Sequence, residues 1–200
     1  MTDSTHLQPV TLSGQHVELK PLQKSHEEGL IAAVNDGNLW ELWYTSIPRP
    51  EGMAAEIERR LKLQDEGSML PFTVFDKAKN QIVGMTTYMN VDLKGPRVEI
   101  GSTWYARSVQ RSPLNTEAKL LLLTHAFEQL NCLAVEFRTH FFNQQSRRAI
   151  ERLGAKLDGI LRSHQRMPDG SLRDTCVYSI VVAEWPTVRH HLRYKLGLID

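Results

Sequence analysis

Three strand-like segments follow one another between residues 70 and 105, and this run constrains the fold more than any other feature. They read "LPFTVFD" (70–76), "QIVGMTTYMNV" (81–91) and "RVEIGSTWY" (97–105), and each is rich in β-branched or aromatic residues. Only the turn-like stretches "KAKN" and "LKGP" separate them. Such short connections join antiparallel neighbours, because a parallel pair needs a crossover of a dozen or more residues. The run therefore predicts an antiparallel meander.

The segments on either side predict the rest of a mixed α/β fold. Alternating or apolar patterns predict further strands at 16–22, 133–141, 155–167 and 171–183. Apolar residues at helical spacing predict helices at 23–34, 50–67, 143–154 and 186–197, and a long one after Asn115. The long helix lies between two strands, as in a crossover that joins parallel neighbours. We expect a mixed, mostly antiparallel sheet flanked by helices, with one parallel pair.

Length and composition are those of an ordinary globular protein. Two hundred residues, 41% hydrophobic and 24% charged, predict one domain over residues 1–200, with its core at about 10–185. A net charge of +1 without long runs of like charge gives no sign of a nucleic-acid partner. No export signal and no apolar stretch of membrane-spanning length are evident, so we expect a cytoplasmic protein. Cys132 and Cys176 have no metal-ligand spacing, and no histidine cluster predicts a metal site.

The stretch "QRSPLNTEAK" joins the third strand of the run to the long helix and is a candidate phosphate site. A helix start presents unpaired N–H groups and the positive end of the helix dipole. Pro113 has no N–H, whereas Asn115 tolerates left-handed backbone and is expected to take the bend and cap the helix. Arg111 and Lys119 add charge that glycine-rich loops lack. The alternative is a plain loop before an amphipathic helix.

The order and spacing of four stretches identify a resemblance that covers about residues 10–185. They are "VEIGSTWY", "QRSPLNTEAKLLLLTHAFE", "NQQSRRAIERLGAKLDGILR" and "DGSLRDTCVYSIVVAEW". Together they resemble the GNAT superfamily of acetyl-CoA-dependent N-acetyltransferases, specifically its RimJ/RimL-like ribosomal-protein N-terminal acetyltransferase branch. The resemblance implies a GNAT-like acyl-CoA acyltransferase fold, acetyl-CoA as co-substrate, no metal, and a primary amine on a peptide, protein or small molecule as acceptor.

The resemblance also implies which residues bind the cofactor. Gln110 matches the first position of the family's Gln/Arg-x-x-Gly-x-Gly/Ala loop, with Pro113 and Asn115 at the glycine and glycine/alanine positions. The loop residues that would contact the pyrophosphate are Gln110, Arg111, Ser112, Leu114, Asn115 and Thr116. The main chain at Trp104 and Tyr105 would meet the pantetheine arm and the developing oxyanion.

Two catalytic residues follow from the same resemblance. Glu99 is the only carboxylate in the strand where the family places its general base, and the alternative is a solvated glutamate paired with a nearby Arg or Lys. The family's acidic tyrosine falls at Ile150, so Ser146 of an "N-x-x-S" pattern would serve as the acid. Asn143 of this pattern would hold the pantetheine amide. Asn143 and Ser146 are equally well explained as helix caps.

Four further alternatives stay open. Arg148 either contacts the ribose phosphate or belongs to a solvated basic face. Arg162, His164, Arg173 and Asp174 surround the last hairpin, where they either contact the acceptor or form cross-strand ion pairs. The C-terminal helix packs on the core or on a second subunit, and the chain is a monomer or a homodimer. At the level of function, the alternative to direct acetyl transfer in a ternary complex is a CoA-binding sensor or interaction module without turnover.

Overall fold

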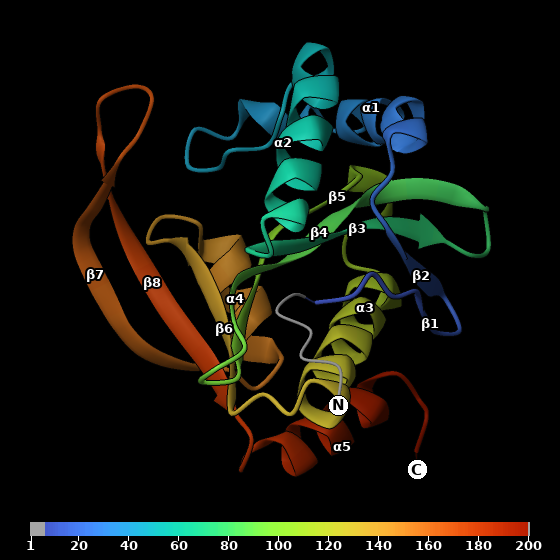
Figure 1. The fold of residues 1–200 in the computed structure, drawn as a ribbon, viewed down its shortest axis with the longest axis vertical. Coiled ribbons are helices and arrows are strands. Elements are labelled where there is room, and N and C mark those ends of the chain that lie inside the picture. The colour runs from blue at the N-terminus through green and yellow to red at the C-terminus, as the bar shows by residue number, and fades with distance from the viewer. Residues whose placement is uncertain (1–6, 200) are drawn as a thin grey trace.

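The computed structural model describes residues 7–199, and an eight-stranded sheet forms its centre (Figure 1). Its strands are β1 (Leu12–Ser13), β2 (Val17–Pro21), β3 (Met69–Asp76), β4 (Gln81–Asp92), β5 (Arg97–Tyr105), β6 (Ala134–His140), β7 (Lys156–Arg166) and β8 (Leu172–Val181). They lie in the order β1-β2-β3-β4-β5-β6-β8-β7. The meander β3–β4–β5 is antiparallel, as is the hairpin β7–β8, whereas β5 and β6 are parallel. The predicted mixed sheet with one parallel pair is confirmed.

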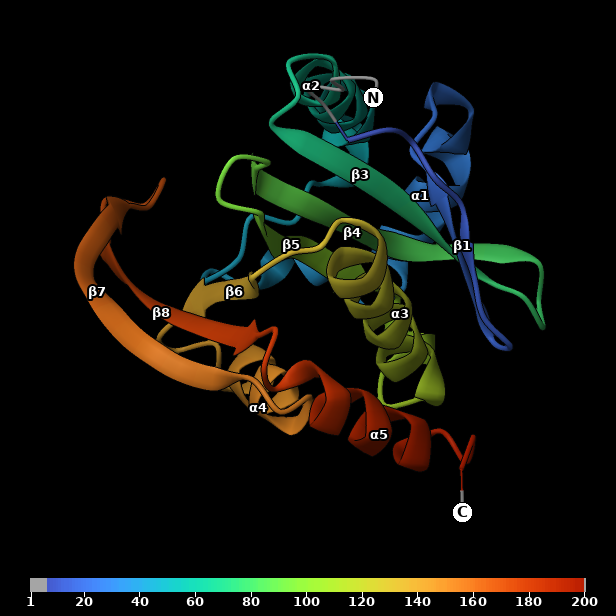
Figure 2. The same cartoon turned by 60° about the horizontal axis from the view of Figure 1, so that its bottom comes forward.

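Helices cover both faces of the sheet (Figure 2). They are α1 (Glu27–Asn35), α2 (Met53–Asp65), α3 (Pro113–Thr124), α4 (Gln144–Arg152) and α5 (Trp185–Lys195). Helices α1 and α2 lie on one face, and α3, α4 and α5 lie on the other. Two successive β4 residues show this alternation, because Thr87 Oγ1 accepts from Arg60 of α2 and the Tyr88 hydroxyl donates to the Leu122 carbonyl of α3.

The parallel pair β5 and β6 stays together only at its start. Pairing covers Arg97–Glu99 on β5 and Ala134–Glu136 on β6, and it ends there although both strands continue. Beyond Glu99 the edge of β5 that faces β6 has no neighbouring strand. The two strands therefore diverge and leave an opening between their carboxyl ends.

One hydrophobic core runs through the described part of the chain, from Val17 to Leu192. The C-terminal helix α5 packs on it: Trp185, Val188 and Leu192 are buried, and the Trp185 ring stacks on Phe127 with centroids 5.2 Å apart. Helix α5 therefore packs on the core of its own chain. The single domain over 1–200 stays a prediction, which this continuous core supports.

Several local elements were not predicted from the sequence. The short strand β1 adds an edge to the sheet, and the long helix ends in a π-helical turn at His125–Gln129. The predicted helix at 23–34 divides into a 3₁₀ turn at Lys24–His26 and α1. Helix α5 begins one residue earlier and ends two residues sooner than the predicted 186–197.

Candidate active site

A β-bulge marks β5 where it leaves β6. Met85 pairs with Trp104 and Thr87 with Gly101, so Thr86 alone stands opposite Ser102 and Thr103. Ser102 has φ of 46°, in the left-handed region. Bulges of this kind end regular pairing and re-aim the groups around them. Here the bulge lies just beyond Glu99, where the pairing of β5 with β6 has ended.

Glu99 lies at the last paired position before this opening and is 7% exposed. Its Oε2 accepts from Asn90 Nδ2 over 2.7 Å, and Arg138 Nε lies 3.6 Å away. Gly101 leaves room for the carboxylate, because a Cβ there would stand 2.8 Å from Glu99 Oε1. Glu99 pairs with Met89, two residues from Thr87, so its side chain projects to the α2 face, opposite the α3 face.

The surroundings of Glu99 raise the pKa of its carboxyl group. Burial is the largest cause, and the charge of Glu136 adds to it, whereas the hydrogen bond from Asn90 and the charges of Arg138 and Arg173 oppose it. Arg138 is largely engaged elsewhere, since its Nη2 lies 3.0 Å from Glu136, which also binds Arg97 over 2.6 Å. A buried carboxylate with a raised pKa beside an opening is suited to accept a proton.

The loop after β5 differs from its predicted shape. Ser112, not Asn115, caps α3: its Oγ accepts from the Leu114 amide over 3.4 Å and donates to the Val109 carbonyl over 2.6 Å. Pro113 is the first helical residue, where a missing N–H is of little consequence. The left-handed bend falls on Arg111, with φ of 62°. The prediction that Asn115 takes the bend and the cap is therefore wrong.

The remaining loop side chains divide into exposed and buried groups. Arg111 is exposed, and no acceptor binds its guanidinium within the described residues. Asn115 and Thr116 sit in the first turn of α3, and Asn115 Oδ1 is buried without a donor there. The prediction that Lys119 adds charge to the loop is wrong. It is buried against Thr103, whose Oγ1 lies 3.1 Å from its Nζ, and burial lowers its pKa to about 7.

Gln110 links the loop to both sides of the opening. Its Nε2 donates to the Tyr105 carbonyl over 2.9 Å, and its Oε1 accepts from Gln145 Nε2 of α4 over 3.4 Å. Trp104 and Tyr105 are buried, and burial raises the pKa of the Tyr105 hydroxyl. The side chain of Gln110 is thus held in place, and Trp104 and Tyr105 offer mainly their main chain to a ligand.

The start of α4 borders the opening from the β6 side. Asn143 caps the helix, and its Oδ1 accepts from the Ser146 amide over 3.0 Å. This confirms the capping role of Asn143 and leaves its Nδ2 and the Ser146 hydroxyl without a partner in the described chain. Arg148 is exposed, with no partner among these residues. Arg147 turns inward, where its Nε donates to the Tyr178 hydroxyl over 3.0 Å.

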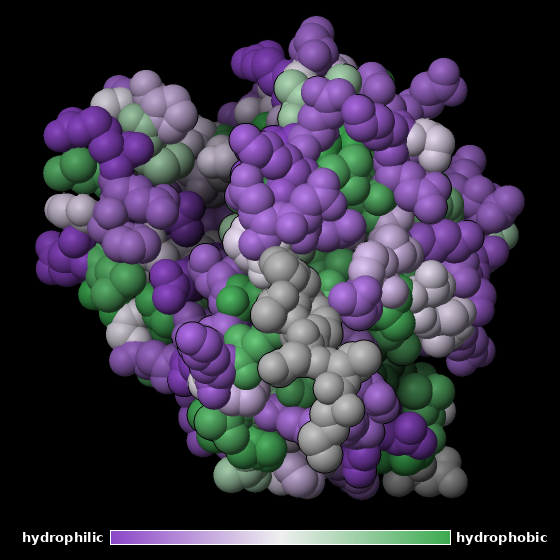
Figure 3. Space-filling model, in the orientation of Figure 1, coloured by the Kyte–Doolittle hydropathy of each residue, from purple (hydrophilic) through white to green (hydrophobic). Residues whose placement is uncertain are grey.

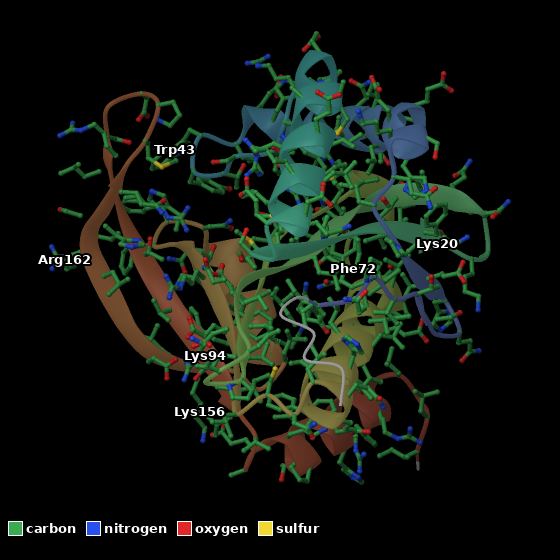
Figure 4. All side chains as sticks on the ribbon, viewed as in Figure 1. Lys20, Trp43, Phe72, Lys94, Lys156 and Arg162 are labelled. Carbon is green, nitrogen blue, oxygen red and sulfur yellow. The ribbon has the colours of Figure 1, made fainter. Side chains whose placement is uncertain are left out.

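Sequence reasoning missed a cluster at the far end of β6. His140 is buried, and its ring lies 5.1 Å from that of Trp43, on the loop between α1 and α2, and 5.8 Å from that of Phe142. Figure 4 places Trp43 on the side of that loop that faces the β7–β8 hairpin. The space-filling view shows a recess between this hairpin and α2 (Figure 3). The loop that carries Trp43 has no periodic pattern, and nothing in the sequence joined it to β6.

Between residues 7 and 199 no three His, Cys, Asp or Glu side chains come together as a metal site. No helix in the same part of the chain is long and apolar enough to cross a bilayer.

The fold and this site define an acyltransferase. The GNAT acetyltransferase domain family matches residues 16–156, and the chain belongs to this family. The "putative ribosomal N-acetyltransferase YdaF" of Bacillus subtilis is 31% identical over 104 residues, a match that spans 52% of this chain and 56% of that relative, so little more than half of each.

Solved structures agree over nearly the whole chain. A GCN5-related N-acetyltransferase from Brucella melitensis is 31% identical, with a TM-score of 0.83 over 94% of this chain and 86% of that one. RimJ of Mycobacterium smegmatis in complex with CoA-disulfide has a TM-score of 0.79 over 94% of this chain and 95% of that one. At 23% identity, the likeness to RimJ shows the fold alone.

The GNAT family uses acetyl-CoA, and the features of the opening fit this cofactor. The unpaired edge of β5 offers main-chain groups to a strand-like ligand. The start of α3 offers the amides and dipole that suit a phosphate. The free Nδ2 of Asn143 and the exposed guanidinium of Arg111 add donors on either side.

Proposed function

We propose that this protein is an N-acetyltransferase that moves an acetyl group from acetyl-CoA directly to a primary amine within a ternary complex. The observation that carries the proposal is Glu99, a buried carboxylate with a raised pKa at the mouth of the β5–β6 opening. An amine attacks only when neutral, and at pH 7 roughly 15% of an α-amine but about 0.04% of a lysine amine is neutral. Glu99 takes the proton that the amine must lose.

In this proposal the opening between β5 and β6 holds the co-substrate. Bound acetyl-CoA supplies the thioester carbonyl carbon that the amine attacks. The loop residues Gln110, Arg111, Ser112, Leu114, Asn115 and Thr116 bind the pyrophosphate, mainly through amides at the start of α3. Asn143 orients the pantetheine arm with its Nδ2, and Arg148 binds the ribose phosphate. The main chain at Trp104 and Tyr105 donates to the oxygen that becomes negative.

Proton return to the leaving thiol falls to the Ser146 hydroxyl. A thiol with a pKa near 8.5 departs readily as a thiolate, so a weak acid is enough. A covalent route through cysteine is disfavoured, because burial raises the pKa of Cys132 to about 11 and also raises that of Cys176. Both thiols are buried in the core, which supports direct transfer.

For the acceptor we propose the α-amine of a protein N-terminus. The name of the Bacillus subtilis relative points to a ribosomal protein, and such an acceptor would place the enzyme in the cytoplasm. An α-amine also makes the smaller demand on the base, as the neutral fractions above show.

A thiol-release assay with acetyl-CoA tests this function over N-terminal peptides, polyamines and aminoglycosides. We expect release above background hydrolysis with peptides, and mass spectrometry should place the acetyl group on the α-amine. Asn143→Ala should weaken CoA binding in calorimetry, whereas Gln144→Ala, at the next position, should not. Tight CoA binding with no release for any amine would favour a CoA-binding module instead. No binding of CoA at hundreds of micromolar would contradict both functions.

A further inference from the structure

Arg173 lies on β8 and forms no salt bridge among the described residues, although its charge acts on Glu99 from a longer distance. Its Nε donates to Thr175 Oγ1 over 3.0 Å, and no carboxylate lies within salt-bridge distance. The neighbouring Arg162 differs, since it binds Asp174 over 2.8 Å. Burial lowers the pKa of Arg173, yet an arginine stays protonated in proteins. The terminal nitrogens of Arg173 are therefore cationic donors without an acceptor.

His140 presents a second hydrogen-bond donor without an acceptor among the described residues. Its Nδ1 accepts from the Phe142 amide over 3.1 Å, so the neutral imidazole carries its hydrogen on Nε2. Nε2 is buried and finds no acceptor between residues 7 and 199. Burial is the largest cause of a lowered pKa of His140; the charge of Arg173 lowers it further, and the charge of Asp174 opposes both. A buried N–H without an acceptor is destabilising unless a ligand supplies one.

Both donors share a face of the sheet with the candidate base. His140 pairs with Thr175 across β6 and β8, and Arg173 is two residues from Thr175, so these side chains project to one face. Arg138, two residues before His140, comes within 3.6 Å of Glu99. Two residues of strand span about 7 Å. A carboxylate bound by the two donors would thus be separated from an amine at Glu99 by the length of one or two residues of an acceptor peptide.

We infer that His140 and Arg173 form a carboxylate-binding subsite, and that the amine acceptor carries a carboxylate close to its reacting nitrogen. Two N–H donors, one of them cationic, are the complement of a carboxylate. The rings of Trp43 and Phe142 beside His140 form an apolar wall next to this subsite. The inference rests on the proposed function, because it specifies the substrate class of the same site.

The carboxylate has two possible sources, which the experiment separates. One is an acidic side chain at the first or second residue of a protein N-terminus, and the other is the α-carboxylate of a free amino acid. We would measure thiol release with peptides that differ only in a Glu, Gln or Lys at the second position, and with free glutamate. If the peptide side chain is the source, kcat/KM for the Glu peptide should exceed that for the Gln peptide by about 10- to 100-fold. If the α-carboxylate is the source, free glutamate should be the best acceptor.

Substitutions of two arginines on the same hairpin then show whether Arg173 causes the preference for an acidic acceptor. Arg173→Ala should reduce the ratio between Glu and Gln peptides to about 1, and Arg173→Lys should keep part of the ratio. The ratio is the readout because the charge of Arg173 also acts on Glu99, which affects both peptides alike. Arg162→Ala is the matched control and should keep the full ratio, because Arg162 is occupied by Asp174 and points away from the body of the protein (Figure 4). For free glutamate, Arg173→Ala should abolish the advantage over glutamate α-amide.

The inference is overturned if the wild-type protein acetylates acidic and neutral acceptors equally, or if Arg173→Ala keeps the preference. Either result leaves the proposed function intact. If no amine is acetylated, the proposed function fails. Calorimetry with the same peptides then still measures whether the subsite binds a carboxylate. Tighter binding of the Glu peptide that disappears in Arg173→Ala supports it, and equal binding of Glu and Gln peptides overturns it.

Discussion

Two buried carboxylates, one at the start of α3 and one on β5, show how differently the fold treats the same group. Glu117 is 4% exposed, and its oxygens accept from the amides of Gln15, His16 and Val17 over 2.7–2.8 Å. A Cβ on Gly14 would collide with this carboxylate, so the turn before β2 is closed tightly around it. Glu99 is 7% exposed and has a single side-chain amide donor, with a guanidinium at 3.6 Å.

Burial alone therefore does not identify a functional carboxylate. Glu117 has three donors for its two oxygens, and it joins α3 to the turn before β2. Glu99 is incompletely satisfied and lies where β5 and β6 separate. A saturated buried charge holds structure together, whereas an unsaturated one with a raised pKa is available for chemistry.

Of the substitutions that test this contrast between the two carboxylates, Glu99→Gln should have the largest effect, a loss of turnover. The amide keeps the shape and can still accept from Asn90, but it takes no proton from the amine. We expect kcat to fall by about 100- to 10,000-fold, the usual contribution of a general base. CoA affinity and melting temperature should stay close to wild type. Steady-state kinetics, calorimetry and thermal unfolding check these points, and equal losses of CoA affinity and turnover would show that Glu99 is structural.

Much of the fold was predictable because its patterns are local. The meander over 70–105 follows from three runs rich in β-branched or aromatic residues and from the short turns between them. The turn sequence "PDG" predicts the β7–β8 hairpin, where the Gly170 amide donates to the Met167 carbonyl over 2.9 Å. The crossover helix predicts the parallel pair. Glu99 was found because it is the only carboxylate on its strand, and its projection away from Val98 and Ile100 follows from the strand period.

The parts that sequence reasoning missed depend on distant contacts. The cap of α3 moved to Ser112 because the backbone turns at Arg111, a residue for which left-handed geometry is unusual. Lys119 reads as a charge for the loop, but the helical turn directs it into the sheet. Trp43 and His140 are 97 residues apart, and only the fold brings their rings together. Glu117 gave no signal either, because its donors belong to residues about a hundred positions earlier.

The second effect should be on stability, in Glu117→Gln. The amide keeps one acceptor oxygen but directs an NH₂ group at amides that need an acceptor, so we expect the free energy of unfolding to fall by about 2 kcal/mol. Urea unfolding followed by circular dichroism measures this loss. Turnover per folded molecule should match wild type, in contrast to Glu99→Gln, which serves as the matched control. A loss of turnover at unchanged stability would reverse the roles that we assign to the two carboxylates.

The smallest effect should be a shift in pH dependence, in Asn90→Gly. Asn90 has φ of 46°, which glycine adopts without strain, so the change removes the amide donor and keeps the backbone. The hydrogen bond from Asn90 lowers the pKa of Glu99, so its loss should raise that pKa further. Because the base acts in its ionised form, the acidic limb of kcat/KM should move to higher pH, by about one unit. Asn80→Gly is the matched control, since Asn80 has φ of 50° in the turn between β3 and β4, away from Glu99. An unchanged limb in Asn90→Gly would mean that another group than Glu99 accepts the proton.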